Sequence, residues 1–155
     1  MKILSASQQR EADAYTIAHE PISSIRLMER AAQACVQRML DKDRPLWTGR
    51  PEIHVVCGMG NNGGDGLAIA RMLAARKYNI QVWLIRHAEQ ASPDFKQNEK
   101  RLKSIKSVKV KWVRSAGELP SALANGAVVI DALFGSGLNR PAEGLAASAI
   151  QWMNR

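Results

Sequence analysis

Two glycine-rich segments carry the residues whose types and spacing could do chemistry. The first, GMGNNGGDG at 58–66, follows the apolar run 53–57 and places two asparagines and an aspartate among its glycines. A glycine-rich turn between a strand and a helix presents backbone N–H groups and a helix N-terminus, which together bind anions such as phosphates. The second segment, GSGLNR at 135–140, follows another apolar run and Asp131. The chemistry indicated is the binding of an anionic ligand between two loops.

A cation site is the second chemical possibility. Asp131 ends the apolar run 127–130, where a lone carboxylate is expensive to bury, and Asn62 is expected across the same crevice. Carboxylate and amide oxygens suit a hard cation, and no His or Cys lies nearby in the sequence to indicate a transition metal. Simpler interpretations stay open: Asp131 as a surface acid that caps its loop, the asparagines as turn residues, and Asp65 as a helix N-cap.

The elements that must position these loops alternate between strand and helix. Apolar β-rich runs predict strands at 53–57, 80–85, 108–113 and 127–130, and amphipathic or capped segments predict helices at 7–19, 22–40, 66–76, from 93, at 118–124 and at 143–152, with a charged loop at 41–51. This pattern predicts an α/β fold: a Rossmann-like three-layer α/β/α sandwich with a mainly parallel sheet in the order 3-2-1-4, preceded by N-terminal helices. In such a sheet the two glycine-rich loops face each other at the switch point between the first and fourth strands.

Length and composition indicate one domain over residues 1–155. Apolar residues make up 46% of the chain and charged residues 23%, typical of a globular protein. The longest apolar runs are too short for a membrane-spanning helix, and the N-terminus has no signal-peptide pattern, so we expect a cytoplasmic protein with no membrane partner. The net charge of +8 favours anionic partners. The basic stretch 96–114 has only Trp112 as an aromatic, so nucleic acid is not an expected partner.

The first loop also contains a literal G-x-G-x-x-G at Gly58, Gly60 and Gly63, which is typical of dinucleotide-binding turns. A dinucleotide-dependent oxidoreductase would normally place an acid about 20 residues later to bind the ribose. Trp83 stands there instead, and the strand ends in Arg86 and His87. Because an arginine at this position suits a 2′-phosphate, the oxidoreductase interpretation is weakened and not excluded.

The two loops and an earlier segment together resemble one family. CGMGNNGGDGLAIARML, DALFGSGLNRP and PISSIRLMERAA are similar to the NAD(P)H-hydrate epimerases, the YjeF N-terminal domain family, over nearly the whole chain. The resemblance implies an isomerase of nicotinamide cofactor repair, which interconverts the R and S forms of hydrated NADH and NADPH (NADHX and NADPHX). A separate or fused ADP- or ATP-dependent dehydratase then restores the S form.

The resemblance also implies the residues of the site. The substrate would be bound by Asn61, Asn62, Gly63, Gly64, Asp65, Gly135, Ser136, Gly137, Leu138, Asn139, Arg140 and Pro141, and a potassium ion would be held by Asn62 and Asp131. In the family the N-terminal helices help to form a homodimer, and the apolar stripe of residues 25–39 is expected to do so here. The alternative is that this stripe packs only on its own sheet.

The family pattern continues into a fifth strand with a D-I-P-S-G motif that this sequence does not contain. A strand as apolar as 128–130 should not be a bare sheet edge, so we expect the chain to be a fragment of a longer protein, and no catalytic acid or base is assigned. A non-catalytic nucleotide-binding or protein-interaction module of the same fold is the main alternative function. Such a module would be expected to lose Asn62 or Asp131, and both are present.

Overall fold

Four short strands form one parallel sheet in the computed structural model, which describes residues 4–42, 44–138 and 140–155. The strands are β1 (Glu52–Cys57), β2 (Asn79–Ile85), β3 (Lys109–Val113) and β4 (Val128–Ala132). Their order is β3-β2-β1-β4 and every neighbouring pair is parallel. The predicted order is confirmed.

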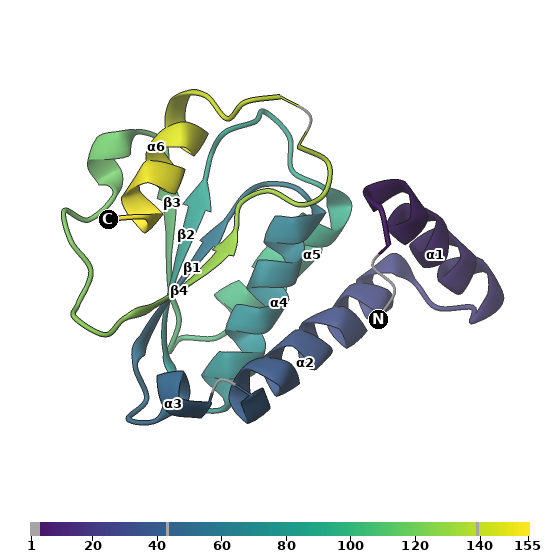
Figure 1. Ribbon diagram of the computed structural model, residues 1–155, viewed down its shortest axis with the longest axis horizontal. Coiled ribbons are helices and arrows are strands. Elements are labelled where there is room, and N and C mark those ends of the chain that lie inside the picture. The colour runs from purple at the N-terminus through teal and green to yellow at the C-terminus, as the bar shows by residue number, and fades with distance from the viewer. Residues whose placement is uncertain (1–3, 43, 139) are drawn as a thin grey trace.

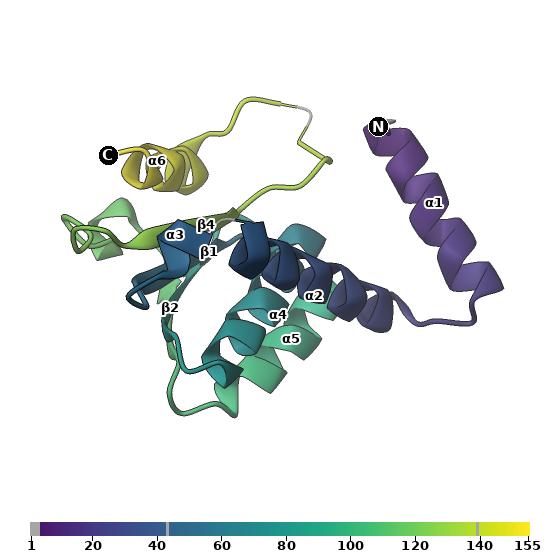
Figure 2. The same cartoon turned by 60° about the horizontal axis from the view of Figure 1, so that its bottom comes forward.

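Helices cover both faces of this sheet (Figures 1 and 2). The helices of the described residues are α1 (Ala6–His19), α2 (Ser24–Lys42), α3 (Arg44–Trp47), α4 (Asn61–Ala75), α5 (Pro93–Lys103) and α6 (Gly144–Met153), with a 3-10 turn at Ala116–Glu118. α2, α4 and α5 lie on one face and α6 on the other (Figure 2). The predicted three-layer α/β/α fold is therefore confirmed. No helix within the described residues is long and apolar enough to cross a membrane.

Two local predictions are wrong. The predicted loop 41–51 contains the short helix α3, whose Trp47 is buried and packs edge-on against Tyr78. The predicted helix 118–124 is only the 3-10 turn at Ala116–Glu118, and Leu119 is already extended. Leu119 precedes Pro120, and the residue before a proline is pushed out of the helical region.

The apolar stripe of α2 packs within the chain. Met28, Ala32 and Val36 are buried, and α2 lies along α4 (Figure 2). Ile25 is half-buried and Cys35 is exposed, so part of the stripe is open, and the expectation that the N-terminal helices help to form a homodimer stays a prediction. α1 differs, because it has no buried residue and lies to one side of the body (Figure 1). A capping box between Ser5 and Gln8 holds its first turn.

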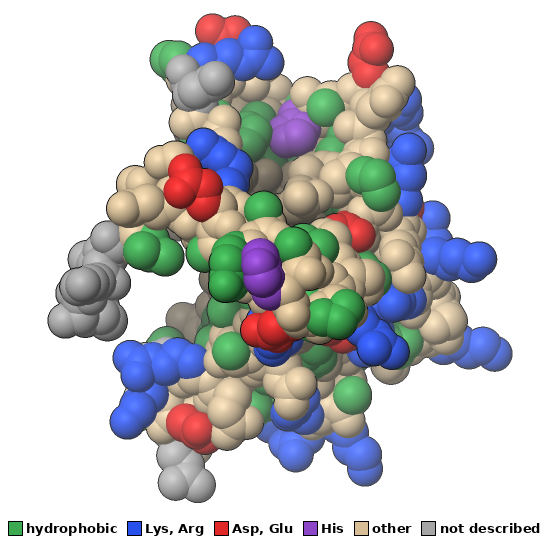
Figure 3. Space-filling model, turned by 90° about the vertical axis from the view of Figure 1, so that its right-hand side faces the viewer, with side chains coloured by type: hydrophobic (Ala, Val, Ile, Leu, Met, Phe, Trp, Pro, Cys, Tyr) green, Lys and Arg blue, Asp and Glu red, His purple; other side chains and the backbone are tan. Residues whose placement is uncertain are grey.

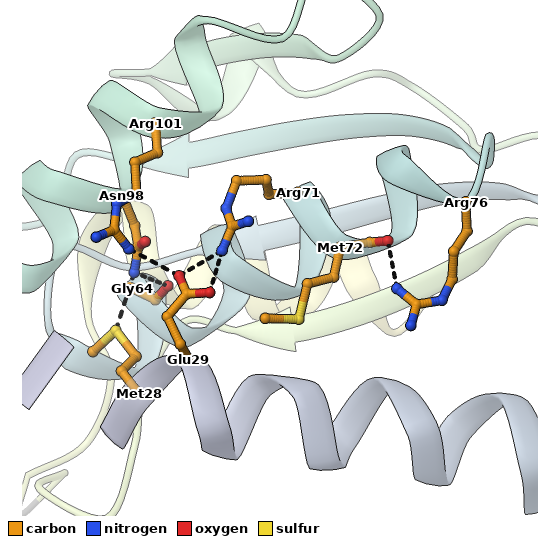
Figure 4. Close-up of polar contacts among 8 residues, drawn as sticks. All are labelled: Met28, Glu29, Gly64, Arg71, Met72, Arg76, Asn98 and Arg101. Carbon is orange, nitrogen blue, oxygen red and sulfur yellow. Dashed lines mark hydrogen bonds and ion pairs between the residues drawn. The ribbon is translucent and has the colours of Figure 1, made fainter. Parts of the chain in front are cut away.

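One glutamate ties the three helices of that face together. Glu29 of α2 forms ion pairs with Arg71 of α4 and with Arg101 of α5, the latter at 3.0 Å (Figure 4). Beside it, the buried Asn98 side chain of α5 donates to the Gly64 carbonyl at 3.1 Å (Figure 4). These contacts link α5 directly to the first turns of α4.

β4 lies at an edge of the sheet. Its residues 128–130 are partly exposed and Asp131 is exposed, whereas β1 is almost wholly buried between β2 and β4. The expectation that a further strand covers this apolar edge stays a prediction.

Gly66 allows α4 to lie directly on β1 and β4, and its replacement tests this packing. A Cβ atom there would meet the Ala132 Cβ at 2.5 Å and the Cys57 Sγ at 2.9 Å. We expect Gly66→Ala to lower the free energy of unfolding by roughly 1–3 kcal/mol, the usual cost of overpacking a core. Urea denaturation measures this. Gly117→Ala, where nothing lies within 4 Å, is the control and should stay within about 0.5 kcal/mol of the wild type. Equal stabilities for the two variants would contradict the packing argument.

Candidate functional site

A cavity of about 770 Å³ opens at the carboxyl ends of β1 and β4, between the two glycine-rich loops. This is the predicted switch point, and the volume lies in the range typical of small-molecule sites. Eight of the predicted substrate residues line it, namely Asn61, Asn62, Asp65, Gly135, Ser136, Gly137, Leu138 and Arg140. Figure 3, seen from the side of α1, shows the surface hollowed on this side and Lys and Arg side chains more abundant than acidic ones.

The other predicted substrate residues lie elsewhere. Gly63 and Gly64 are buried within the first turns of α4 and do not line the cavity. Pro141 lines a neighbouring hollow, and Asn139 lies outside the described residues. The cavity is thus built from most of the predicted set, with Gly63 and Gly64 packed behind the residues that line it.

Backbone contacts explain why two of the glycines are required. A Cβ atom on Gly63 would lie 1.9 Å from the Gly58 carbonyl oxygen, and one on Gly58 would lie 2.0 Å from the Leu133 carbonyl oxygen. Side chains cannot fit at such distances, so the loop after β1, the first turn of α4 and the loop after β4 pack backbone to backbone. The glycine pattern therefore has a steric cause.

Asn62 joins the two loops across the crevice. Its Nδ2 donates to the Phe134 carbonyl at 2.9 Å, and the Gly58 amide donates to the Ala132 carbonyl at 3.0 Å. The predicted position of Asn62 opposite the loop after β4 is confirmed. This bond uses the amide nitrogen as a donor, and the Oδ1 atom of Asn62 stays available as an acceptor.

Asp131 is placed differently from the expectation. Its side chain is exposed, because β4 is an edge strand, and it does not line the cavity. One carboxylate oxygen accepts from the Leu133 amide at 2.9 Å. This is the loop-capping role that the sequence left open, and the argument from the cost of burying this carboxylate is wrong. The second oxygen is free of this bond, and potassium binding by Asn62 and Asp131 stays a prediction.

Of the two carboxylates among the described residues that line the cavity, Asp65 is partly buried and Asp13 is exposed. Asp65 is not an N-cap, because α4 begins at Asn61 with Gly60 as its cap and Asp65 lies inside the helix. Burial, then the negative charges of Asp13 and Asp94, raise the pKa of Asp65 to about 6. Asp65 therefore titrates close to neutral pH inside the cavity.

Residues outside the predicted substrate set also line the cavity. Gln9, Arg10 and Asp13 of α1 line the cavity, as do His87 after β2 and Phe134 after β4. The His87 and Phe134 rings stack with centroids 5.1 Å apart, and burial lowers the pKa of His87. Residues 9, 10 and 13 lie on one face of α1, a helix with little apolar character. This cluster of polar residues on one helix face was the sequence feature that could have indicated that α1 lines a site.

The site offers anion-binding groups and oxygen ligands. The first turn of α4 lies at the cavity, because Gly60, Asn61 and Asn62 line it, and the first N–H groups of a helix have no partner within it. Among the described residues, no group of three or more His, Cys, Asp or Glu side chains is arranged to hold a metal. A potassium site would depend instead on amide and carbonyl oxygens together with a single carboxylate.

Comparisons with known proteins agree with this geometry. The family described as YjeF-related protein N-terminus matches residues 24–155. A Roseobacter litoralis protein named NAD(P)H-hydrate epimerase is 33% identical to this chain, and the match covers 92% of this chain and 67% of that protein. An Oenococcus oeni protein of the same name is 34% identical, and the match covers 97% of this chain and 67% of that protein. The crystal structure of yeast ynu0 aligns with a TM-score of 0.80 and 25% identity, over 99% of this chain and 65% of that one.

The chain spans about two thirds of the length of the curated relatives it matches. The family match covers most of the chain, including both loops that form the cavity, so the resemblance inferred from sequence is confirmed. The protein belongs to the YjeF-related N-terminal domain family.

Proposed function

We propose that the protein is an NAD(P)H-hydrate epimerase, an isomerase that interconverts the R and S forms of NADHX and NADPHX. The observation that carries this proposal is the cavity between the two family loops, whose lining combines polar side chains with the N-terminus of α4. Its relatives in Roseobacter litoralis and Oenococcus oeni bear this name. An interconversion assay with purified protein and either hydrate, followed by chromatography, tests the proposal.

The anionic part of the hydrate would be held by the first loop and its helix. The unpaired N–H groups at the start of α4 and its dipole favour a pyrophosphate there. Arg10 and Arg140 add positive charge to the lining. The polar loop side chains then orient the nicotinamide end, where C6 changes configuration.

The proposal includes a potassium ion held by Asn62 and Asp131. The remaining acceptor of Asn62 and the second oxygen of Asp131 support it, because hard cations prefer such oxygens. A bound cation would supply electrostatic stabilisation of charge that develops as C6 loses its configuration.

We also propose a cytoplasmic homodimer that works with an NAD(P)H-hydrate dehydratase. Support for the dimer comes from α1, whose Tyr15 and Ile17 are exposed large apolar side chains on a helix with no buried residue. Met28, Ala32 and Val36 of α2 are already buried within the chain, whereas α1 buries no residue, so we place the contact with a second copy on α1.

Replacing Asp131 tests the cation proposal through the reaction. We expect Asp131→Ala to lower the rate of R/S interconversion about 100-fold to 1,000-fold, the usual cost of losing one electrostatic contact of this kind. Asp131→Asn should keep the loop shape and lose the charge, with a smaller defect. Asp41→Ala, an exposed aspartate of α2, is the control and should keep the wild-type rate. Equal rates for the wild type and Asp131→Ala would rule out this role.

Asp65 predicts a pH dependence of stability. Because its pKa is raised from 3.8 to about 6 in the folded protein, the folded state binds the proton more tightly than the unfolded state. Asp65 therefore destabilises the fold above pH 6, and this penalty disappears as the pH falls through 6 toward 4. Asp65→Asn should melt at a higher temperature than the wild type at pH 8, and the difference should vanish near pH 4.

Asp13→Asn offers a graded comparison for the same measurement, because it removes one of the two neighbouring charges that raise the pKa of Asp65. It should show the same trend with a smaller amplitude. A difference between Asp65→Asn and the wild type that is constant from pH 4 to pH 8 would show that Asp65 does not titrate in this range.

The dimer proposal is tested by measuring the molecular mass of the protein in solution. Light scattering at tens of micromolar should give twice the chain mass for the wild type. Changing both Tyr15 and Ile17 to serine should yield a monomer, because these exposed side chains support no buried packing within the chain. A wild-type mass equal to one chain would refute the dimer.

A further inference from the structure

We propose that Arg86 and Arg114 form a subsite for the 2′-phosphate of the adenosine ribose, so that the protein prefers NADPHX to NADHX. This inference rests on the proposed function and adds a substrate preference to it. The two arginines are adjacent at the carboxyl edge of the sheet, one after β2 and one after β3.

Arg86 and Arg114 line a common hollow of about 470 Å³. The Arg86 amide donates to the Val113 carbonyl at 2.9 Å, so the backbone holds the two positions side by side. Within the described parts of the chain neither guanidinium forms an ion pair or a hydrogen bond with another residue, and both side chains are exposed. Their donors are therefore available to a ligand.

This hollow is linked to the proposed nucleotide site through shared lining residues. It shares Arg86 and His87 with a neighbouring hollow of about 540 Å³, which in turn shares His87 and Phe134 with the main cavity. The stacked rings of His87 and Phe134 lie where the hollows meet. The three hollows thus lie side by side, from the N-terminus of α4, past the end of β2, to the two arginines.

The order of the strands gives this position its chemistry. In a sheet of order 3-2-1-4 the pyrophosphate lies at the helix after the first strand, and the adenosine ribose lies beside the end of the second. An acid there binds the 2′-hydroxyl, whereas an arginine accommodates a 2′-phosphate. Here the first residue after β2 is Arg86.

The charges match a phosphate monoester. Such a group carries about −1.5 to −2 charges at pH 7 and accepts several hydrogen bonds, and a guanidinium binds it with two parallel donors. Glu89 is the one carboxylate among the residues that line this hollow, so the two arginines leave an excess of positive charge. A 2′-hydroxyl would leave both arginines without a partner.

Two nucleotides that differ only in the 2′-phosphate test the subsite. Calorimetry at one fixed ionic strength compares adenosine 2′,5′-bisphosphate with adenosine 5′-monophosphate. The wild type should bind the bisphosphate at least about 10-fold more tightly, the size expected for one hydrogen bond to a charged group. The Arg86→Ala/Arg114→Ala double variant should lose this preference and bind the monophosphate as before.

Arg38→Ala is the matched control, because it removes an exposed arginine near the end of α2 that adjoins α3. This end of α2 lies at the opposite end of the strands from the loops that follow β2 and β3 (Figure 1). The Arg38→Ala variant should keep the preference. Equal affinities of the wild type for the two nucleotides, no detectable binding of the bisphosphate, or a preference that survives in the double variant would each overturn the subsite.

The kinetics of the two hydrates separate this inference from the function it extends. If the protein interconverts the hydrates but treats NADHX and NADPHX alike, the function stands and the subsite fails. If the bisphosphate is preferred through the two arginines but neither hydrate is interconverted, the subsite stands and the proposed function fails. When both hold, the double variant should raise the KM for NADPHX about 10-fold and leave that for NADHX unchanged.

Discussion

The close backbone contact at the start of α4 is the constraint on which the rest of the site depends. Gly63 lies against the Gly58 carbonyl, and Gly58 lies against the Leu133 carbonyl, at separations that leave no room for a Cβ atom. This contact brings the N-terminus of the helix to the carboxyl ends of β1 and β4 together. The cavity lies where these segments meet, and Asn62 closes the arrangement through its bond to Phe134.

Charge is distributed unevenly around this contact. Arg10 and Arg140 line the main cavity and Arg86 and Arg114 line the hollow beyond β2, in a chain with a net charge of +8. Asp65, with Asp13 and Asp94 near it, forms the acidic side of the cavity. An anionic dinucleotide is attracted by these basic residues, while the acidic side is suited to the hydroxyl groups of a ribose or to a nicotinamide amide, which donate hydrogen bonds.

Much of the fold was predictable because its signals are local. Continuous apolar runs identified the four strands, Ser92 and Pro93 marked the start of α5, and the strand order followed from general rules for parallel sheets. The switch point and most of the cavity lining followed from that order.

Features that depend on tertiary structure were not predictable. The exposure of Asp131 follows from the edge position of β4, and the contribution of α1 to the cavity depends on how the N-terminal helix is placed against the two loops. The raised pKa of Asp65 depends on Asp13 and Asp94, which are distant in sequence. The early start of α4 at Asn61 reflects packing against Gly58, which a periodicity of apolar residues does not reveal.

The most direct measurement of the central claim is the interconversion rate of Gly63→Ala, taken well below its melting temperature. The added methyl must move the loop after β1 away from α4, so we predict a folded protein that has lost most of its activity, by about 10-fold or more, since small displacements in a site cost rates of this order. Gly60→Ala, with nothing within 4 Å, should lose far less. A folded Gly63→Ala protein with the wild-type rate would contradict the claim that this backbone contact builds the site.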